Sequence, residues 1–150
     1  MRIRIENLGM LIAVSLLTVS CGGKGTAAAE GGFTLASIRG SYAGIFEGKI
    51  NTSGGLLEFL GTGIFVADGK GNFTGTETYT VVTTPCQATV SGTYTVNPDG
   101  SGTNSATFTT TSPGCSSGTY TQSLAIGQSG RLVLLSNTNG DQINEEWHLQ

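Results

Sequence analysis

From residue 33 to the C-terminus, apolar and polar residues alternate with a period of two, and this pattern constrains the fold more than any other feature of the sequence. The alternation is clearest in residues 88–96, where Ala, Val, Gly, Tyr and Val occupy one parity and Thr and Ser the other. Successive side chains of a strand point to opposite faces, so such a segment has one apolar and one polar face. The 22 threonines fit this pattern because β-branched side chains suit a half-buried pleated surface. The sequence therefore predicts an all-β domain.

Eight segments show this alternation, and short connections join them. They are residues 40–50, 56–67, 72–82, 87–97, 103–110, 118–126, 131–136 and 143–149. Short connections favour antiparallel pairing of neighbouring strands. Eight such strands predict an antiparallel up-and-down β-barrel, because closure removes the unpaired edges. Glycines on the inward parity support closure, and a two-sheet β-sandwich is the alternative architecture.

The N-terminal residues have the composition of an export signal. Arg2 and Arg4 precede an apolar run that extends from Leu8 to Val19, which is too short to span a bilayer as a helix. The Gly- and Ala-rich residues that follow cannot fill a core, and such a composition is typical of a flexible spacer. We therefore divide the chain into a signal peptide (1–20), a tether (21–32) and a β-barrel domain (33–150).

The segment Leu17-Thr18-Val19-Ser20-Cys21 resembles the lipobox of bacterial lipoproteins. Family members usually carry Leu three positions before the Cys, where this chain has Thr18. The resemblance implies that Cys21 is lipidated and anchors an exported protein to the membrane, since several acyl chains hold firmly. In Gram-negative members of this family, Asp directly after the lipidated Cys tends to retain the protein at the inner membrane. This chain has Gly22 there, so the resemblance implies that a Gram-negative host would place the protein at the outer membrane. The alternative is an ordinary secretory signal with Cys21 left as a free thiol.

Cys86 and Cys115 are predicted to form a disulfide. Following the strand directions along the chain places both residues in loops at the same end of the barrel, opposite to the entry of the tether. An exported protein reaches a compartment where disulfides persist.

At the tether end, the motif Gly-Thr-x5-Asp-Gly-x-Gly occurs at residues 61–71 and again at 92–102. Lys70 stands where a calcium ligand would be needed, so we interpret these motifs as hairpin turns.

Composition and charge exclude several classes of function. A net charge of −3 without a basic cluster argues against a nucleic-acid partner. One His and three Cys are too few for a convincing zinc or iron site, and no cofactor is expected. His148 has the opposite parity to Trp147 and should face solvent, which leaves the many hydroxyls without a base. A non-enzymatic role is therefore favoured.

Two acidic residues, Glu77 and Glu145, share the parity of the apolar side chains. A buried acid costs free energy unless it is paired. We therefore expect Glu77 to lie near a barrel end or to be turned outward by a bulge, and Glu145 and Glu146 to form a solvated edge. If the barrel is hollow instead, a ligand could contact several inward side chains. These candidates are Tyr42, Phe65, Glu77, Tyr79, Tyr94 and Tyr120.

Three sequence segments resemble segments of small secreted bacterial β-barrel proteins of unassigned function. They are Arg39–Gly44, Val66–Gly75 and Gly92–Gly100. Some of these are loosely similar to lipocalin-like and allene oxide cyclase-like barrels. The resemblance supports a barrel and carries over no catalytic residue. We predict an envelope lipoprotein with a structural or interaction role. The alternatives are a lipocalin-like binder of a small apolar ligand and, less favoured, a cyclase or isomerase using Glu77 or a tyrosine.

Overall fold

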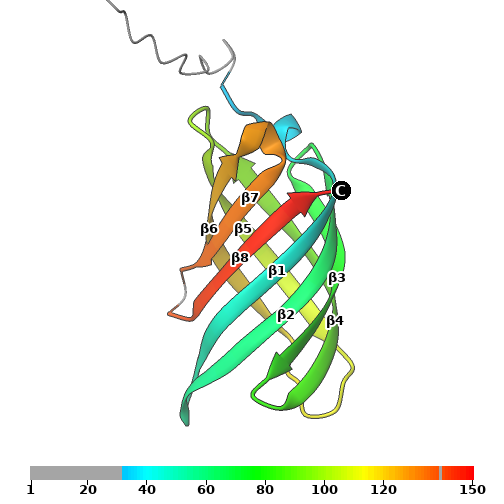
Figure 1. Ribbon diagram of the computed structural model, residues 1–150, viewed down its shortest axis with the longest axis vertical. Coiled ribbons are helices and arrows are strands. Elements are labelled where there is room, and N and C mark those ends of the chain that lie inside the picture. The colour runs from blue at the N-terminus through cyan, green and yellow to red at the C-terminus, as the bar shows by residue number, and fades with distance from the viewer. Residues whose placement is uncertain (1–31, 139) are drawn as a thin grey trace, which may run out of the picture.

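The computed structural model describes residues 32–138 and 140–150, which form a closed antiparallel barrel (Figure 1). The predicted signal peptide, Cys21 and the tether as far as residue 31 lie outside the described residues. The strands are β1 (Arg39–Thr52), β2 (Gly55–Asp68), β3 (Asn72–Val81), β4 (Thr84–Val96), β5 (Ser101–Thr110), β6 (Gly118–Gly127), β7 (Leu132–Asn137) and β8 (Gln142–Leu149). In the described part of the chain, no helix is long and apolar enough to cross a bilayer.

The strands follow one another around the barrel in sequence order. Each strand pairs antiparallel with the next, and β1 pairs with β8 from Tyr42 opposite Leu149 to Lys49 opposite Gln142. This last pairing closes the sheet, so the predicted eight-stranded up-and-down barrel is confirmed and the β-sandwich alternative is wrong. The alternating parities of the strands face solvent and the interior, and the outward parity is mainly polar except on β2, which exposes Leu60, Ile64 and Val66.

The end where the chain enters is closed by two short 3₁₀ helices, η1 (Leu35–Ser37) and η2 (Gln128–Gly130) (Figure 1). Two buried tyrosines bind them to the wall. The Tyr94 hydroxyl donates to the carbonyl of Ile38 at 2.7 Å, and the Tyr42 hydroxyl donates to the carbonyl of Gly130 at 2.8 Å. Ile38 is fully buried beneath them. This end of the barrel is therefore plugged.

Aromatic rings fill the half of the barrel next to these helices. Trp147 stacks on Phe65 with ring centroids 4.6 Å apart and meets the edge of Phe73 at 5.1 Å. Inward glycines leave space for the rings. A Cβ atom at Gly44 would lie 2.5 Å from the Phe65 ring, and one at Gly75 would lie 2.6 Å from it. The glycines here accept neighbouring side chains, so this half has a packed core.

The Asp-Gly segment between β2 and β3 is a hairpin turn, as predicted. Asp68 Oδ1 accepts from the backbone N–H groups of Lys70 at 2.7 Å and Asn72 at 3.0 Å. Its other oxygen accepts from the Asn72 side chain at 2.8 Å. The carboxylate satisfies the turn's own donors, which is the usual role of Asp in such turns.

The other four connections gather at the opposite end of the barrel (Figure 1). The Sγ atoms of Cys86 in β4 and Cys115 in the β5–β6 loop lie at disulfide bonding distance, with Cα atoms 6.0 Å apart. The predicted cysteine pairing is confirmed, but Cys86 lies in β4 and not in the preceding loop as predicted. The pairing ties the longest loop at this end to the wall of the barrel.

Removing this bond should lower the free energy of unfolding by about 3.5 kcal/mol, because the loop it closes in the unfolded chain spans 29 residues. The test is urea unfolding of the double variant Cys86→Ala, Cys115→Ala under non-reducing conditions. The unmodified protein treated with dithiothreitol is the matched control and should unfold at the same midpoint as the variant. A midpoint unchanged by both treatments would contradict the prediction.

Candidate ligand-binding site

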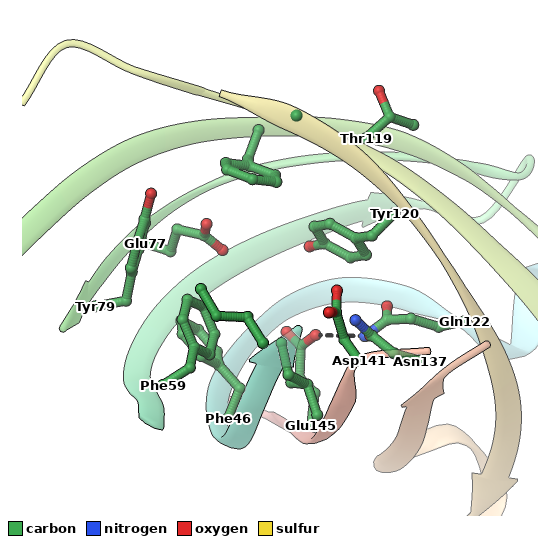
Figure 2. A pocket seen from close by; sticks show the side chains of 14 residues that line it. Phe46, Phe59, Glu77, Tyr79, Thr119, Tyr120, Gln122, Asn137, Asp141 and Glu145 are labelled. Atoms are coloured by element: carbon green, nitrogen blue, oxygen red, sulfur yellow. Dashed lines mark hydrogen bonds between the residues drawn. The ribbon is translucent and has the colours of Figure 1, made fainter. Parts of the chain in front are cut away.

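A cavity of about 180 Å³ occupies the half of the barrel nearer the disulfide and is partly open to solvent (Figure 2). Its apolar wall consists of aromatic and aliphatic side chains from six strands. They are Phe46, Ile50, Phe59, Tyr79, Phe108, Tyr120 and Ile143. Polar residues complete the lining at the floor and the rim. They are Glu77, Thr119, Gln122, Asn137, Asp141 and Glu145, with Gly118 beside them.

Five aromatic rings form a continuous band along the wall of this cavity. Phe46 and Phe59 are stacked at 5.4 Å, Phe59 and Tyr79 are 5.1 Å apart, and Tyr79 meets Phe108 at 6.5 Å. Phe108 continues to Tyr120 at 5.8 Å. Because β1, β2, β3, β5 and β6 each contribute one ring, closure of the barrel is what assembles the band. Such a wall suits an apolar body or a cation, since ring faces carry partial negative charge.

Glu145, on β8, is 4% exposed and stands at the centre of a buried polar network. Trp147 Nε1 donates to its Oε1 at 2.6 Å, and Gln122 Nε2 donates to its Oε2 at 3.2 Å. Asn104 Nδ2 in turn donates to Gln122 Oε1 at 2.6 Å. Burial raises the pKa of Glu145, and the two donors oppose part of that rise because they favour the charged form. The network lies between the packed core and the cavity.

Glu77, on β3, is 7% exposed and points into the same cavity (Figure 2). Its carboxyl accepts no hydrogen bond from any of the described residues. Burial, and then the nearby negative charge of Glu145, raise the pKa of Glu77 to about 8. At neutral pH this group is therefore mostly protonated and uncharged.

The expectation that Glu77 is turned outward and that Glu145 lies on a solvated edge is wrong. The sequence argument treated burial of an acid as too costly, but the cavity gives both carboxyls room and the donors to Glu145 compensate its burial. The expectation holds for the neighbouring outward residues. Glu146 is exposed, 3.2 Å from the ring of His148, whose side chain is 52% exposed.

The six side chains proposed as ligand contacts divide between the two halves of the barrel. Glu77, Tyr79 and Tyr120 line the cavity. Three others lie in the plugged half, where Tyr42 and Tyr94 use their hydroxyls to bind backbone carbonyls and Phe65 packs on Trp147. These three are outside the cavity lining.

Sequence reasoning did not include Gln122 among the site residues, although a signal for it was present. Gln122 and Asn104 have the inward parity of β6 and β5, where an amide needs a buried partner. A polar residue on the apolar parity of two adjacent strands is a sign of an internal network. The rim residues Asn137 and Asp141 gave no such signal, because they lie at the end of β7 and in the β7–β8 loop.

Chemically, the site can hold a ligand by apolar contact, by cation–π attraction and by hydrogen bonds to carboxyl groups. Among residues 32–138 and 140–150, no group of three or more His, Cys, Asp or Glu residues is placed to hold a metal ion.

Comparison with known proteins identifies no relative of this chain, since no family model, curated protein or solved structure matches it. The resemblances to lipoproteins and to lipocalin-like barrels therefore remain predictions.

Proposed function

We propose that this barrel is a non-enzymatic binding protein that holds one small molecule in the cavity. The observation that carries the proposal is the buried carboxyl of Glu77, which faces an aromatic-walled cavity and has no hydrogen-bond partner among the described residues. A buried polar group without a partner costs free energy that a ligand or an ordered water can recover. Proteins use concave apolar sites with a few inward polar groups to bind small molecules.

The size of the cavity supports a guest of about one ring. An engineered apolar cavity of about 150 Å³ in another protein binds benzene, whereas sites for drug-sized molecules span about 300–1,000 Å³. The present cavity, about 180 Å³, is close to the smaller case. Its partly open mouth lets a short substituent extend toward the rim.

Binding is favoured over a cyclase or isomerase activity by the residues that line the cavity. No histidine, lysine or cysteine is among the described lining residues. The hydroxyls therefore have no activating base of the kind that nucleophilic catalysis uses most often. Lipidation of Cys21, if the lipobox is used, would hold the η1 end nearer the bilayer and leave the cavity mouth facing away from it.

A structural or interaction role is the second candidate, and the outer wall provides one observation in its favour. Ile45, Leu60, Ile64 and Val66 are exposed large apolar residues on β1 and β2. Ile45 lies opposite Thr62, between Leu60 and Ile64, so the side chains form one stripe. Exposed apolar patches often mark contacts with other macromolecules.

Native mass spectrometry of the gently purified protein tests the proposal. We expect a discrete added mass that is lost on denaturation and is largely absent from a Phe59→Ala variant. The missing ring should weaken binding about tenfold or more, which corresponds to about 1.4 kcal/mol. Leu60→Ala, on the outer face beside Phe59, is the matched control and should retain the guest. Equal retention by both variants would place the guest elsewhere, and a protein that neither carries nor takes up any small aromatic would favour the interaction role.

A further inference from the structure

We infer that the guest is a small organic amine bound as its ammonium cation, with the ammonium group between Glu77 and Glu145 and the carbon skeleton against the five-ring aromatic wall. This inference rests on the proposed function and specifies its ligand. Three properties of the cavity lead to it: its hydrogen-bonding groups, its charge and its walls.

Two acceptor groups of the cavity have no hydrogen-bond partner among the described residues. The Glu77 carboxyl has no partner among the described residues, and Asn137 Oδ1 is buried without one. Asp141 Oδ1, at the rim, accepts from the backbone N–H of Asn51 at 2.8 Å. No lysine, arginine or histidine is among the described lining residues. An alkylammonium group has three N–H donors and no acceptor, and is therefore the complement of this set.

The charge of the cavity favours the same ligand. Glu77 and Glu145 face one buried space (Figure 2), and two like charges there cannot both ionise without a large cost. A cation between them allows both carboxyls to ionise, whereas an anion or a neutral ring gives the second negative charge no compensation. The aromatic band attracts a cation as well, because ring faces stabilise ammonium groups. The same apolar band gives a metal ion no ligands.

Entry of the cation should displace a proton. The titratable groups that face the cavity are Glu77, Glu145, Asp141, Tyr79 and Tyr120. Burial raises the pKa of Glu77 to about 8 and raises the pKa values of Glu145 and both tyrosines, so the tyrosines stay neutral. At about pH 7 the ligand arrives with its three N–H protons, Glu77 ionises to pair with it, and the carboxyl proton passes to the solvent. Binding should therefore release about one proton and tighten between about pH 6 and pH 8.

Isothermal titration calorimetry of the purified protein with three matched probes tests the inference. Benzylamine carries the ring and the ammonium, benzyl alcohol replaces the cation with a neutral group, and benzyltrimethylammonium keeps the charge without N–H donors. We expect benzylamine to bind at least about tenfold more tightly than either of the others. Titrations in phosphate and in HEPES at about pH 7, which differ in ionisation enthalpy and contain no primary ammonium group, should show the release of about one proton.

Two variants make the test specific. Glu77→Gln should weaken benzylamine about tenfold or more, abolish proton release and leave benzyl alcohol unchanged. Glu146→Gln, an exposed glutamate next to Glu145 on the outward face, is the matched control and should change nothing. If benzyl alcohol binds as tightly as benzylamine, or if Glu77→Gln binds the amine normally, the amine inference is overturned while the proposed function stands. If none of the three probes binds and no guest is found in the native protein, both are overturned.

Discussion

Raising the pH from about 5 to about 9 should destabilise the protein, and Glu77→Gln should remove most of that loss. The pKa of Glu77 is raised from 4.5 to about 8 by burial and by Glu145. Between these values the folded state holds a proton that the unfolded chain has lost, so stability is full below about pH 4.5 and falls until about pH 8. The difference corresponds to about 5 kcal/mol. Glu145, whose pKa is also raised, contributes with the same sign.

Urea unfolding of the wild type and Glu77→Gln across this range provides the measurement. The variant should be the more stable protein at about pH 9, while the two should be similar at about pH 5. Titrating groups remote from the cavity cancel in this difference, whereas Glu145, which is coupled to Glu77, does not. Asp68 and Asp99 have lowered pKa values, so their contributions are lost only at more acidic pH. Glu146→Gln is the control for removal of one negative charge. Parallel pH profiles for the wild type and Glu77→Gln would show that Glu77 ionises freely in the folded protein.

The barrel could be predicted from the sequence because its determinants are local. Alternation decides which side of a strand is buried, and short connections decide which strands are neighbours. Both rules apply at each strand independently, so the eight strands and their antiparallel order emerged together. The pairing of Cys86 with Cys115 followed from strand direction and from the predicted export, because an even number of strands, β4 and β5, separates the two cysteines and returns the chain to the same end of the barrel.

The position of the cavity could not be predicted in the same way. Parity places a side chain inside the barrel, but it does not determine whether that side chain lies in the packed half next to η1 and η2 or in the half that holds the cavity. Tyr94 and Tyr79 have equivalent patterns on neighbouring strands, yet Tyr94 binds the carbonyl of Ile38 beneath η1 while Tyr79 lines the cavity. The difference arises from residues that precede β1 and fold back over one end. That contact joins residues 56 positions apart and has no periodic signal.

The two buried glutamates show a different limit. Sequence reasoning weighed each acid alone, and on that basis an outward position was the less costly choice. In the folded protein Glu145 belongs to a network with Trp147, Gln122 and Asn104. Trp147 on β8 and Gln122 on β6 donate to Glu145, and Asn104 on β5 donates to Gln122. The donors of this network stabilise the carboxylate of Glu145 and none of them reaches Glu77. Near neutral pH Glu77 keeps its proton, and the described lining residues of the cavity include carboxyl groups and aromatic rings but no lysine, arginine or histidine.

Trp147 joins the packed core to this network, so its removal should cause the largest loss of stability of any single substitution that we consider at constant pH. The indole is 2% exposed, stacks on Phe65 and donates to Glu145. Trp147→Ala should lower the free energy of unfolding by about 3–5 kcal/mol through the space it leaves. Trp147→Phe refills most of that space but leaves Glu145 Oε1 without its donor, which should cost about 1–3 kcal/mol.

The pH dependence distinguishes packing from hydrogen bonding in these two variants. Loss of the indole N–H removes a donor that favours the charged form of Glu145, so the pKa of Glu145 should rise further and the fall in stability toward about pH 9 should steepen in Trp147→Phe. His148→Ala, the exposed neighbour on the outward face, should change neither quantity. If Trp147→Phe were as stable as the wild type and showed the same pH profile, the bond to Glu145 would contribute nothing, and Trp147 would act through its packed ring alone.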